Sequence, residues 1–431
     1  MLLSQKGGIF IKRERIFSVK AREIISGRGI PAVEVDVALE GGAVVRASAP
    51  SGISVSDYEA IDLRDGMQRY MGKGVLRAVA AVNNLISPLL AGVPVDEQEK
   101  IDQLMIDLDG TPNKSRLGSN AMTAVSLAVA RGGALVHNLQ LYGYLGGKDA
   151  VGLPVICSNF ISGSKTAGNQ LDFEDFLVIP YGFDTFAESI RAVVEMFHIL
   201  YENLKKRFGL IAQITALAPP LRRNEDAFDL LSEAIEQAGY SGRVGFGIDV
   251  ASGLLYNADT GLYKLERGVL DRDTLIAYYA ELCKRYPILF IEDGLHEDDY
   301  DGFALMRERL PTLVVGDDLF ATNAARLQKG ADMQAANAVL IKINQAGTVS
   351  EMLKTTRLAD QLGYTLAVST RSGETEDAHA SDIAVGIQAR LMKTGCPFRG
   401  EMVTKWNRMM EIEAQLGERT RFVGKGLIQA E

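Results

Sequence analysis

The stretch NAVLIKINQAGTVSEMLKTTRLADQLGYTLAVSTRSG, residues 337–373, decides the fold of this chain. It contains two apolar runs, AVLI and TLAV, each short enough to be a buried strand. Between them, TVSEMLKTTRLADQLG places apolar residues at helical spacing and ends at Gly363. Two short apolar runs joined by an amphipathic helix are typical of a βαβ unit, in which the two strands are parallel.

The same alternation extends on both sides of this unit. From LPVICSNFIS, residues 153–162, apolar runs alternate with amphipathic stretches in GRVGFGIDVA, TLIAYYAELCKRY, PILFIEDGL, FALMRERL, TLVVGDDLFA and NAARLQKGA. A long series of strands and helices predicts a parallel sheet with helical crossovers. A closed (β/α)8-type barrel suits the length better than an open sheet, so we expect a barrel domain over residues 149–431.

Residues 1–148 have a different texture. Residues 21–50 alternate apolar and polar side chains, as in AVEVDVALEGGAVVRASAP, and the central GG favours a β-hairpin. PSGISVSDYEAIDLRDG, residues 50–66, has the turn chemistry of a long loop. Helical periodicity follows in GVLRAVAAVNNLISPLL, DEQEKIDQLMIDLDG and SNAMTAVSLAVARGGALVHNLQLYGYL. Strands followed by helices predict a smaller α+β domain that ends near residue 148.

Composition restricts the class of protein. The 431 residues carry a formal net charge of −9, which argues against nucleic acid or an anionic membrane as the main partner. Cys157, Cys283 and Cys396 lie far apart, so they indicate neither a disulfide framework nor a zinc site. The sequence predicts no signal peptide and no window near the roughly 18 apolar residues of a membrane helix. We therefore expect a cytoplasmic protein.

Charged residues stand where the predicted strands end. They are Asp249 in GIDV, Glu292 and Asp293 in FIED, Asp317 and Asp318 in VVGDD, Lys342 in LIKIN and Arg371 in LAVSTRS. An acid after a strand is often only the N-cap of the next helix, but five consecutive strand ends of this kind indicate a site. Clustered carboxylates require a cation, and Mg²⁺ suits all-oxygen ligands. Lys342 is expected there as a base or in a structural ion pair with Asp318.

Ordered motifs over nearly the whole chain resemble the enolase family. They are AREIISGRGIPAVEVDV, PSGISVSDYEAIDLRDG, GKGVLRAV, DEQEKIDQLMIDLDGTPNKSRLGSNA, GFGIDVA, FIEDGLHEDDYDGF, VGDDLFATN, LIKINQAGT, STRSGETED and LMKTGCPFRGE. The resemblance implies an α+β lid domain and a modified barrel that opens with two strands and then two helices. It also implies two Mg²⁺ ions, dehydration of 2-phosphoglycerate to phosphoenolpyruvate, and a homodimer or higher homo-oligomer.

The resemblance also implies a set of metal ligands. Asp249, Glu292 and Asp317 look like the three ligands of the first Mg²⁺. Ser54, in PSGIS, is similar to the loop serine that helps to bind the second ion with the substrate.

Further residues match groups that handle the substrate. Lys342 matches the base that removes the proton α to the carboxylate, and Asp318 matches its neighbour. Lys393 matches the lysine that faces the substrate carboxylate, and Arg371 with Ser372 matches the phosphate-binding pair. Metal ions and a lysine are known to stabilise the enolate in enolase-superfamily sites.

The chain departs from the family pattern on one side of the site. Thr370 and Thr166, both expected near the substrate, stand where enolases have histidines. The loop G-D-E-G-G-x-A-P-N, which supplies a glutamate for the leaving hydroxyl, corresponds to ITALAPPL at residues 214–221. Asp175 aligns with another family glutamate and is expected to be catalytic, and Glu174 replaces a glutamine. Loss of a general acid costs about 10²–10⁴ in rate.

Three functions stay open at the level of sequence. The default is a Mg²⁺-dependent lyase that converts 2-phosphoglycerate to phosphoenolpyruvate. The first alternative is a paralogue that acts on another phosphorylated or phosphonylated carboxylate. The second is a non-catalytic paralogue with a binding role, although the retained carboxylates and lysines count against it. A small anionic phosphorylated substrate is the expected partner in both enzymatic cases.

One substitution concerns assembly. In the family, an arginine near the C-terminus pairs across the dimer with the glutamate that matches Glu34, and here Glu411 stands at the arginine position. We still expect a homodimer, with an interface that differs locally.

Overall fold

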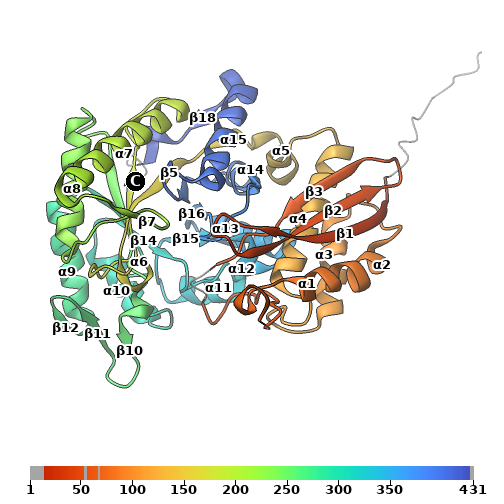
Figure 1. Ribbon diagram of the computed structural model, residues 1–431, viewed down its shortest axis with the longest axis horizontal. Helices are drawn as coiled ribbons and strands as arrows, with labels where there is room; N and C mark the ends of the chain where they lie inside the picture. The colour runs from red at the N-terminus through yellow and green to blue at the C-terminus, as the bar shows by residue number, and fades with distance from the viewer. Residues whose placement is uncertain (1–13, 53–55, 67, 428–431) are drawn as a thin grey trace, which may run out of the picture.

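The computed structural model describes residues 14–52, 56–66 and 68–427, with Lys165 and Thr166 described by their backbone alone (Figure 1). Two regions lie side by side: an N-terminal region with a small sheet and several helices, and a C-terminal barrel. Across the described residues, no helix combines the length and apolar character needed to cross a membrane.

Eight strands of the described chain close the barrel. They are β5 (Val155–Ser162), β6 (Asp175–Ile179), β9 (Gly245–Asp249), β13 (Ile288–Glu292), β14 (Leu313–Gly316), β15 (Ala338–Ile341), β16 (Thr365–Ser369) and β17 (Leu391–Thr394). Each pairs with the next, and β17 pairs with β5. The predicted closed barrel is confirmed. The predicted parallel sheet with helical crossovers is interrupted at β6, which runs antiparallel to β5 and β9, because only a short connection with a four-residue helix separates it from β5.

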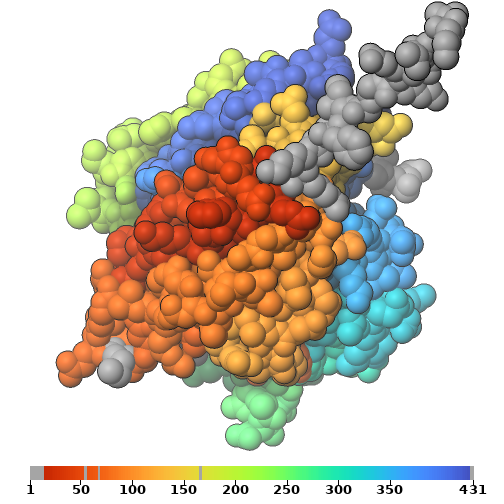
Figure 2. Space-filling model, turned by 90° about the vertical axis from the view of Figure 1, so that its right-hand side faces the viewer, coloured from red at the N-terminus to blue at the C-terminus, as the bar shows by residue number. Residues whose placement is uncertain are grey.

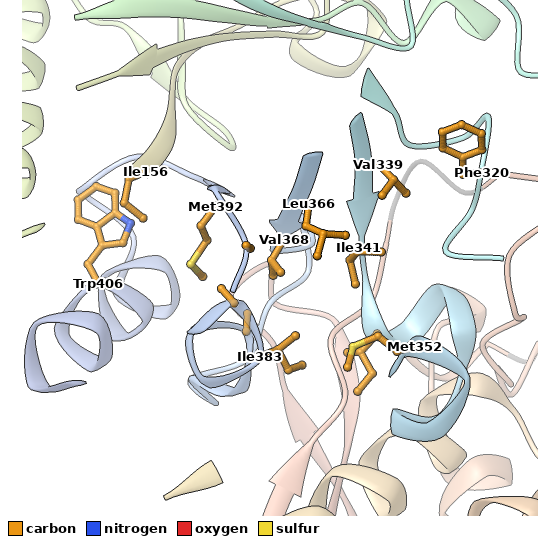
Figure 3. Packing of buried hydrophobic residues seen from close by; sticks show 14 of the residues in the cluster. Ile156, Phe320, Val339, Ile341, Met352, Leu366, Val368, Ile383, Met392 and Trp406 are labelled. Carbon is orange, nitrogen blue, oxygen red and sulfur yellow. The ribbon is translucent and has the colours of Figure 1, made fainter. Parts of the chain in front are cut away.

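Helices cover the outside of the barrel. They are α7 (Phe186–Phe208), α8 (Asn224–Gln237), α9 (Arg272–Arg285), α10 (Tyr300–Arg309), α11 (Ala324–Asp332), α13 (Val349–Gln361), α14 (His379–Gly386) and α15 (Gly400–Leu416). The barrel opens with two strands and then α7 and α8, as the resemblance implies. Side chains alternate along each strand, so Leu340 belongs to the inner cluster and Ile341 to the outer one. Figure 3 shows outward Ile341 and Val368 beside Met352 and Ile383 of the covering helices.

The N-terminal region has an antiparallel sheet of β1 (Ile16–Ile25), β2 (Pro31–Leu39) and β3 (Val44–Ser48), and α4 (Ser119–Val136) packs against β2 and β3. The predicted hairpin is confirmed as β2–β3, but residues 21–50 also hold part of a third strand, β1. Other helices are α1 (Leu76–Ala81), η2 (Val82–Ile86), α2 (Ser87–Leu90), α3 (Gln98–Asp109) and α5 (Leu141–Gly146). The third predicted helix is interrupted between α4 and α5, where Asn138 adopts a positive φ of 52°.

Shorter elements complete the described chain. They are η1 (Arg69–Gly72), η3 (Gly147–Asp149), β4 (Gly152–Leu153), α6 (Ser164–Ala167), β7 (Ala212–Gln213), β8 (Leu217–Ala218), η4 (Ser252–Leu254), β10 (Tyr256–Asn257), β11 (Leu262–Leu265), β12 (Gly268–Leu270), α12 (Ile343–Ala346), η5 (Gly417–Arg419), β18 (Arg421–Phe422) and η6 (Gly424–Leu427). Strands β10 to β12 form a separate small sheet that the sequence pattern did not predict.

Polar contacts join the two regions, and Figure 2 shows the N-terminal region packed directly against the C-terminal one. Asp102 of α3 accepts hydrogen bonds from the N–H and the hydroxyl of Ser350 in α13, at 2.9 and 2.6 Å. The N–H of Ala60 donates to the carbonyl of Gln345 at 2.9 Å. The first pair of contacts joins α3 to α13, and the Ala60 contact ties the described part of the 50–66 loop to the residues that follow β15.

Candidate active site

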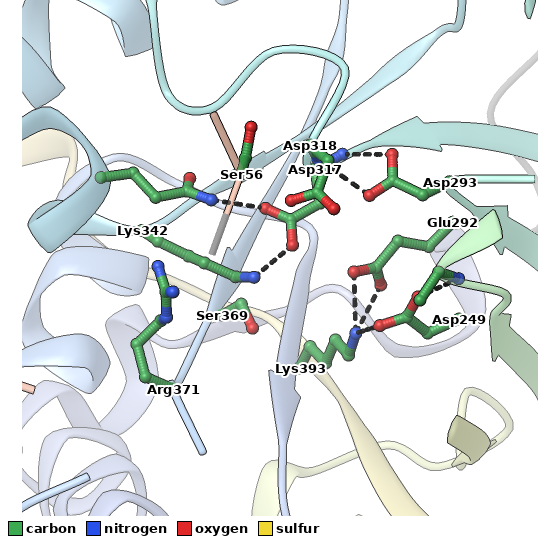
Figure 4. A network of polar contacts seen from close by, with 12 residues as sticks. Ser56, Asp249, Glu292, Asp293, Asp317, Asp318, Lys342, Ser369, Arg371 and Lys393 are labelled. Atoms are coloured by element: carbon green, nitrogen blue, oxygen red, sulfur yellow. Dashed lines mark hydrogen bonds and ion pairs between the residues drawn. The ribbon is translucent and has the colours of Figure 1, made fainter. Parts of the chain in front are cut away.

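One cleft at the carboxyl ends of the barrel strands collects most of the residues singled out from the sequence (Figure 4). Its lining includes Glu174, Asp175, Asp249, Asp293, Asp317, Asp318, Lys342, Thr370, Arg371, Ser372 and Lys393. Asp249 ends β9, Asp317 follows β14 and Lys342 follows β15. Carboxyl ends of neighbouring parallel strands share one rim of a barrel, so residues distant in sequence meet there.

Lys393 lies among the carboxylates of two strands. Its Nζ is 2.6 Å from Asp249 Oδ2, 2.8 Å from Glu292 Oε1 and 2.7 Å from Glu292 Oε2. Burial opposes the charge on Lys393, but Asp249 and Glu292 raise its pKa well above the usual value. Burial, followed by the charge of Asp249, raises the pKa of Glu292. The ammonium of Lys393 therefore offsets part of a strongly anionic cluster.

Lys342 pairs with Asp317, whose other oxygen accepts a hydrogen bond from Gln345 Nε2 at 2.9 Å. Burial opposes the charge on Lys342, but Asp317 raises its pKa above the usual value. Although burial acts in the opposite sense, Lys342 and Lys393 hold the pKa of Asp317 below its usual value. The structural ion pair considered for Asp318 is thus made by Asp317. Burial and the charge of Asp317 raise the pKa of Asp318 to about 8.

Glu292, Asp293 and Asp317 form a buried group whose carboxylate oxygens lie within 4.8 Å of one another. The Asp293 carboxylate also accepts the N–H groups of Asp317 and Asp318, at 3.1 and 2.8 Å. An all-oxygen donor set of this kind fits a hard divalent cation such as Mg²⁺. Asp249, predicted as a ligand of the first ion, lies outside this group of three and pairs with Lys393, as Glu292 also does. Asp293 had been noted only as a strand-end acid.

Arg371 follows β16, and its guanidinium is held by a carboxylate of the 50–66 loop. Nη1 donates to Glu59 Oε2 at 2.7 Å, and Nη2 donates to Glu59 Oε1 at 3.3 Å. Thr370 and Ser372, on either side of Arg371, line the cleft. The N–H of Thr370 donates to the carbonyl of Lys393 at 3.0 Å, so the loop after β16 is tied to β17. Glu59 was missed from the sequence because nothing local links it to Arg371.

The opposite wall is built from β5, β6 and residues 212–218. Asn159 Nδ2 donates to Asp175 and to Ser162 Oγ, the latter at 2.9 Å, and Ser162 Oγ lies 2.7 Å from Thr215 Oγ1. Burial raises the pKa of Asp175 to about 6, and burial with the charges of Asp249 and Asp175 raises that of Glu174 to about 8. Apart from Asp175, which a pKa of about 6 leaves mostly ionised at pH 7, this wall presents uncharged polar groups, and we call it the neutral wall.

Several predicted features lie outside this geometry. Ser54 and the side chain of Thr166 lie outside the described residues. Glu34 of β2 pairs with Arg22 of β1 in the same sheet, and Glu411 lies 2.9 Å from Arg408. Both glutamates that bear on the expected interface therefore have arginine partners within their own chain.

Comparisons with known proteins cover almost the whole chain. The enolase N-terminal domain model matches residues 16–145, and the model for the enolase C-terminal TIM barrel domain matches residues 150–431. Enolase of Methanopyrus kandleri is 47% identical over 416 residues, which are 95% of this chain and 97% of that protein. Enolase of Rubrobacter xylanophilus is 46% identical over 420 residues, 95% of this chain and 97% of the relative. Enolase of Methanocaldococcus jannaschii is 44% identical over 410 residues, 94% and 96% of the two chains.

Proposed function

The chain belongs to the enolase family and is an enolase-type lyase, and from that premise we propose that Lys342 removes the proton α to the carboxylate of a small phosphorylated acid. The default substrate is 2-phosphoglycerate. The C–H electron pair moves into the carboxyl group as an enolate, then forms the C2–C3 double bond as the C3 hydroxyl departs with a proton as water. The product is phosphoenolpyruvate. The observation that carries this proposal is the convergence of Lys342, Lys393 and four strand-end carboxylates on one cleft.

The proposed site takes two Mg²⁺ ions, the second of which binds together with the substrate. Asp249, Glu292 and Asp317 would hold the first Mg²⁺, with Asp293 beside them, and Ser54 would help to hold the second. Bound Mg²⁺ supplies positive charge that offsets the carboxylate cluster and stabilises the two negative charges of an enolate.

The basic side chains divide the remaining work. Lys342 accepts the proton. Burial and then the positive charges of Arg371 and Lys393 favour its neutral form, against the effect of Asp317, which raises its pKa. Lys393 faces the substrate carboxylate, and Arg371 with Ser372 holds the phosphate. Asp318 lies beside the base and orders that wall through its N–H contact with Asp293.

A second candidate substrate class is favoured by the neutral wall. Asn159, Ser162, Asp175 and Thr215 form one hydrogen-bonded group, with Thr370 and Thr166 as further candidates for substrate contact. Such a wall suits a related phosphorylated or phosphonylated carboxylate whose substituent there accepts or donates hydrogen bonds. Asp175 is the acid of this wall and the candidate proton donor.

We further propose a division at residues 148/149 into a lid domain and a catalytic barrel, assembly as a homodimer or higher homo-oligomer, and a cytoplasmic location. Three free cysteines suit a reducing compartment, and the charge of −9 disfavours nucleic acid.

Two assays test the function. The protein with Mg²⁺ and 2-phosphoglycerate is followed by enol absorbance, and loss of deuterium from α-labelled substrate to solvent is followed separately. Dehydration supports the default reaction. Exchange without dehydration, or turnover of another phosphorylated or phosphonylated acid in a panel, supports the second candidate. The absence of both across the panel, with Lys342→Ala indistinguishable from the unaltered protein, would contradict the proposal.

A further inference from the structure

We propose that Glu59 is a positioning residue that acts through Arg371 and holds its guanidinium in the orientation that binds the substrate phosphate. This inference rests on the proposed function, since it takes Arg371 as the phosphate group's partner. The N-terminal region would then supply a residue, Glu59, that orients the phosphate-binding arginine of the barrel.

The contact between the two residues is two-pronged. Both Glu59 oxygens accept from the guanidinium, Oε2 at 2.7 Å and Oε1 at 3.3 Å, and Arg371 Nη1 also donates to Asn344 Oδ1 at 3.3 Å. The side chains of Arg371 and Glu59 are 4% and 2% exposed. A planar guanidinium gripped at two nitrogens keeps one orientation, unlike a singly bonded one.

Glu59 is itself fixed by its own loop. Its Oε1 accepts the N–H of Ser56 at 2.9 Å, so the carboxylate is anchored before any substrate arrives. The loop backbone also encloses Arg371, because a Cβ added to Gly52 would overlap Arg371 Nη2. Ser51 and Gly373 exchange backbone hydrogen bonds of 3.1 and 2.9 Å, which join the loop to the residues just after Arg371. The geometry therefore couples the 50–66 loop to the position of one guanidinium.

Glu59 lies behind Arg371 rather than in the path of the substrate. It is not among the residues that line the cleft of Lys342 and Lys393. It lines a second cavity, between the 50–66 loop and the barrel, and Arg371 borders both cavities. The carboxylate therefore supports the guanidinium from the side away from the reacting groups, and it does not occupy the phosphate position.

Electrostatics agree with a supporting role. Burial opposes the charge on Arg371, but Glu59 raises its pKa above the usual value, so the guanidinium stays charged. A buried arginine without this partner would turn toward other acceptors, and a misplacement of about 1 Å can cost on the order of 10² in rate or binding. Preorganisation of the guanidinium is the expected benefit.

The test measures binding of inorganic phosphate by calorimetry in the presence of Mg²⁺, and because inorganic phosphate is not turned over, the measurement does not depend on catalysis. Glu59→Ala should weaken phosphate binding about 10- to 100-fold. Glu59→Gln, which keeps one acceptor oxygen, should restore part of it and fold if the alanine variant does not. In an Arg371→Ala background, Glu59→Gln should have no further effect, because its influence passes through Arg371.

Asp102→Asn is the matched control. It weakens another buried carboxylate contact between the two regions, remote from the cleft, and should lower the melting temperature without changing phosphate affinity.

Tighter phosphate binding in Glu59→Ala would overturn the proposal, since Glu59 would then compete with phosphate. The proposal would also be overturned if Glu59→Gln lowered phosphate affinity equally in the unaltered protein and in the Arg371→Ala background. If Arg371→Ala binds phosphate normally, both this inference and the proposed phosphate contact fail. If only the Glu59 variants bind normally, this inference alone fails.

Discussion

The two walls of the cleft are built on opposite principles. On the wall formed by β9 to β17, acidic side chains stand at the ends of β9, β13 and β14, and basic side chains stand at the ends of β15, β16 and β17. Ion pairs join the two sets, as between Lys393 and the carboxylates of Asp249 and Glu292. On the wall of β5, β6 and residues 212–218, short side chains such as Ser162 and Thr215 bond to one another without an ion pair between them. Buried charges depend strongly on their partners, whereas a neutral network tolerates replacement at a smaller cost.

The difference accounts for the retention of most family motifs on the charged wall, where Thr370 is the exception, and for their alteration on the other wall. Proton abstraction next to a carboxylate needs a base, a cation site and an anion site at once, so the charged wall cannot lose one member alone. The neutral wall only has to fit the departing or neighbouring group. We infer that the charged wall sets the type of reaction and the neutral wall selects the substrate.

The largest expected effect comes from removing Lys342, the proposed base. Lys342→Ala should lower the exchange of the substrate's α-deuterium by about 10²–10⁴, measured by NMR. Lys342→Arg is the matched variant, because it keeps the positive charge next to Asp317 but cannot give up its proton. It should melt near the unaltered protein and still lose exchange. If Lys342→Arg still exchanged the α-deuterium, Lys342 would not be the base.

Withdrawal of the cation comes next. Chelation should abolish turnover and excess Mg²⁺ should restore it.

Mg²⁺ at 100 times its Kd should stabilise the fold by about 2.7 kcal/mol, measured by denaturant unfolding. Asp317→Asn should remove most of this stabilisation, whereas Asp259→Asn, on an exposed turn, should leave it unchanged. Equal stabilisation of both variants would place the ion elsewhere.

A smaller effect is expected on the neutral wall. Ser162→Ala breaks the contacts with Asp175 and Thr215, at a cost of about 1 kcal/mol in stability. The ratio of kcat/KM between two acids of the panel should shift up to about tenfold, because 1.4 kcal/mol corresponds to a factor of ten. Exchange of the bound substrate's α-deuterium should change little. If Ser162→Ala and Lys342→Ala lose exchange alike, the division between the walls is wrong.

The smallest expected effect is on how the stability of the fold changes with pH. It compares Asp172, a buried acid whose pKa is raised, with Asp377, a buried acid paired with Arg131. Burial raises the pKa of Asp172 to about 6, above its unfolded value of about 3.9, so its contribution is favourable below pH 4 and is lost as pH rises through 6. Despite burial, Arg131 holds the pKa of Asp377 well below its usual value. That contribution is present above about pH 4 and is lost as pH falls.

Asp172→Asn should therefore flatten the decline in melting temperature between pH 4 and 6. Asp377→Asn should lower the melting temperature near neutral pH. The difference in melting temperature between this variant and the unaltered protein should become smaller in acid. The changes should be a few degrees. Parallel pH profiles for both variants would contradict this assignment.

Local patterns predicted most of the fold. Alternating apolar runs and helical periodicity predicted the strands and helices of the barrel, and the GG turn predicted β2–β3, because these signals lie within a few adjacent residues. Closure of the barrel was inferred from the length of the region. They did not predict the direction of β6 or the small sheet of β10 to β12, since strand direction depends on where the chain returns in space. At the cleft, strand-end positions predicted that Asp249, Asp317 and Lys342 would meet, but not how their charges would pair.

The sequence by itself determined the family, the eight-stranded barrel and the residue types at the strand ends, because each follows from short-range periodicity and ordered motifs. Only the tertiary structure decided that Lys342 pairs with Asp317, that Asp293 joins Glu292 in the buried acidic group, and that Glu59 grips Arg371. Glu59 and Arg371 are 312 residues apart in the chain. Partner choice among buried charges depends on angstrom-scale distances and shared desolvation, which no local pattern encodes.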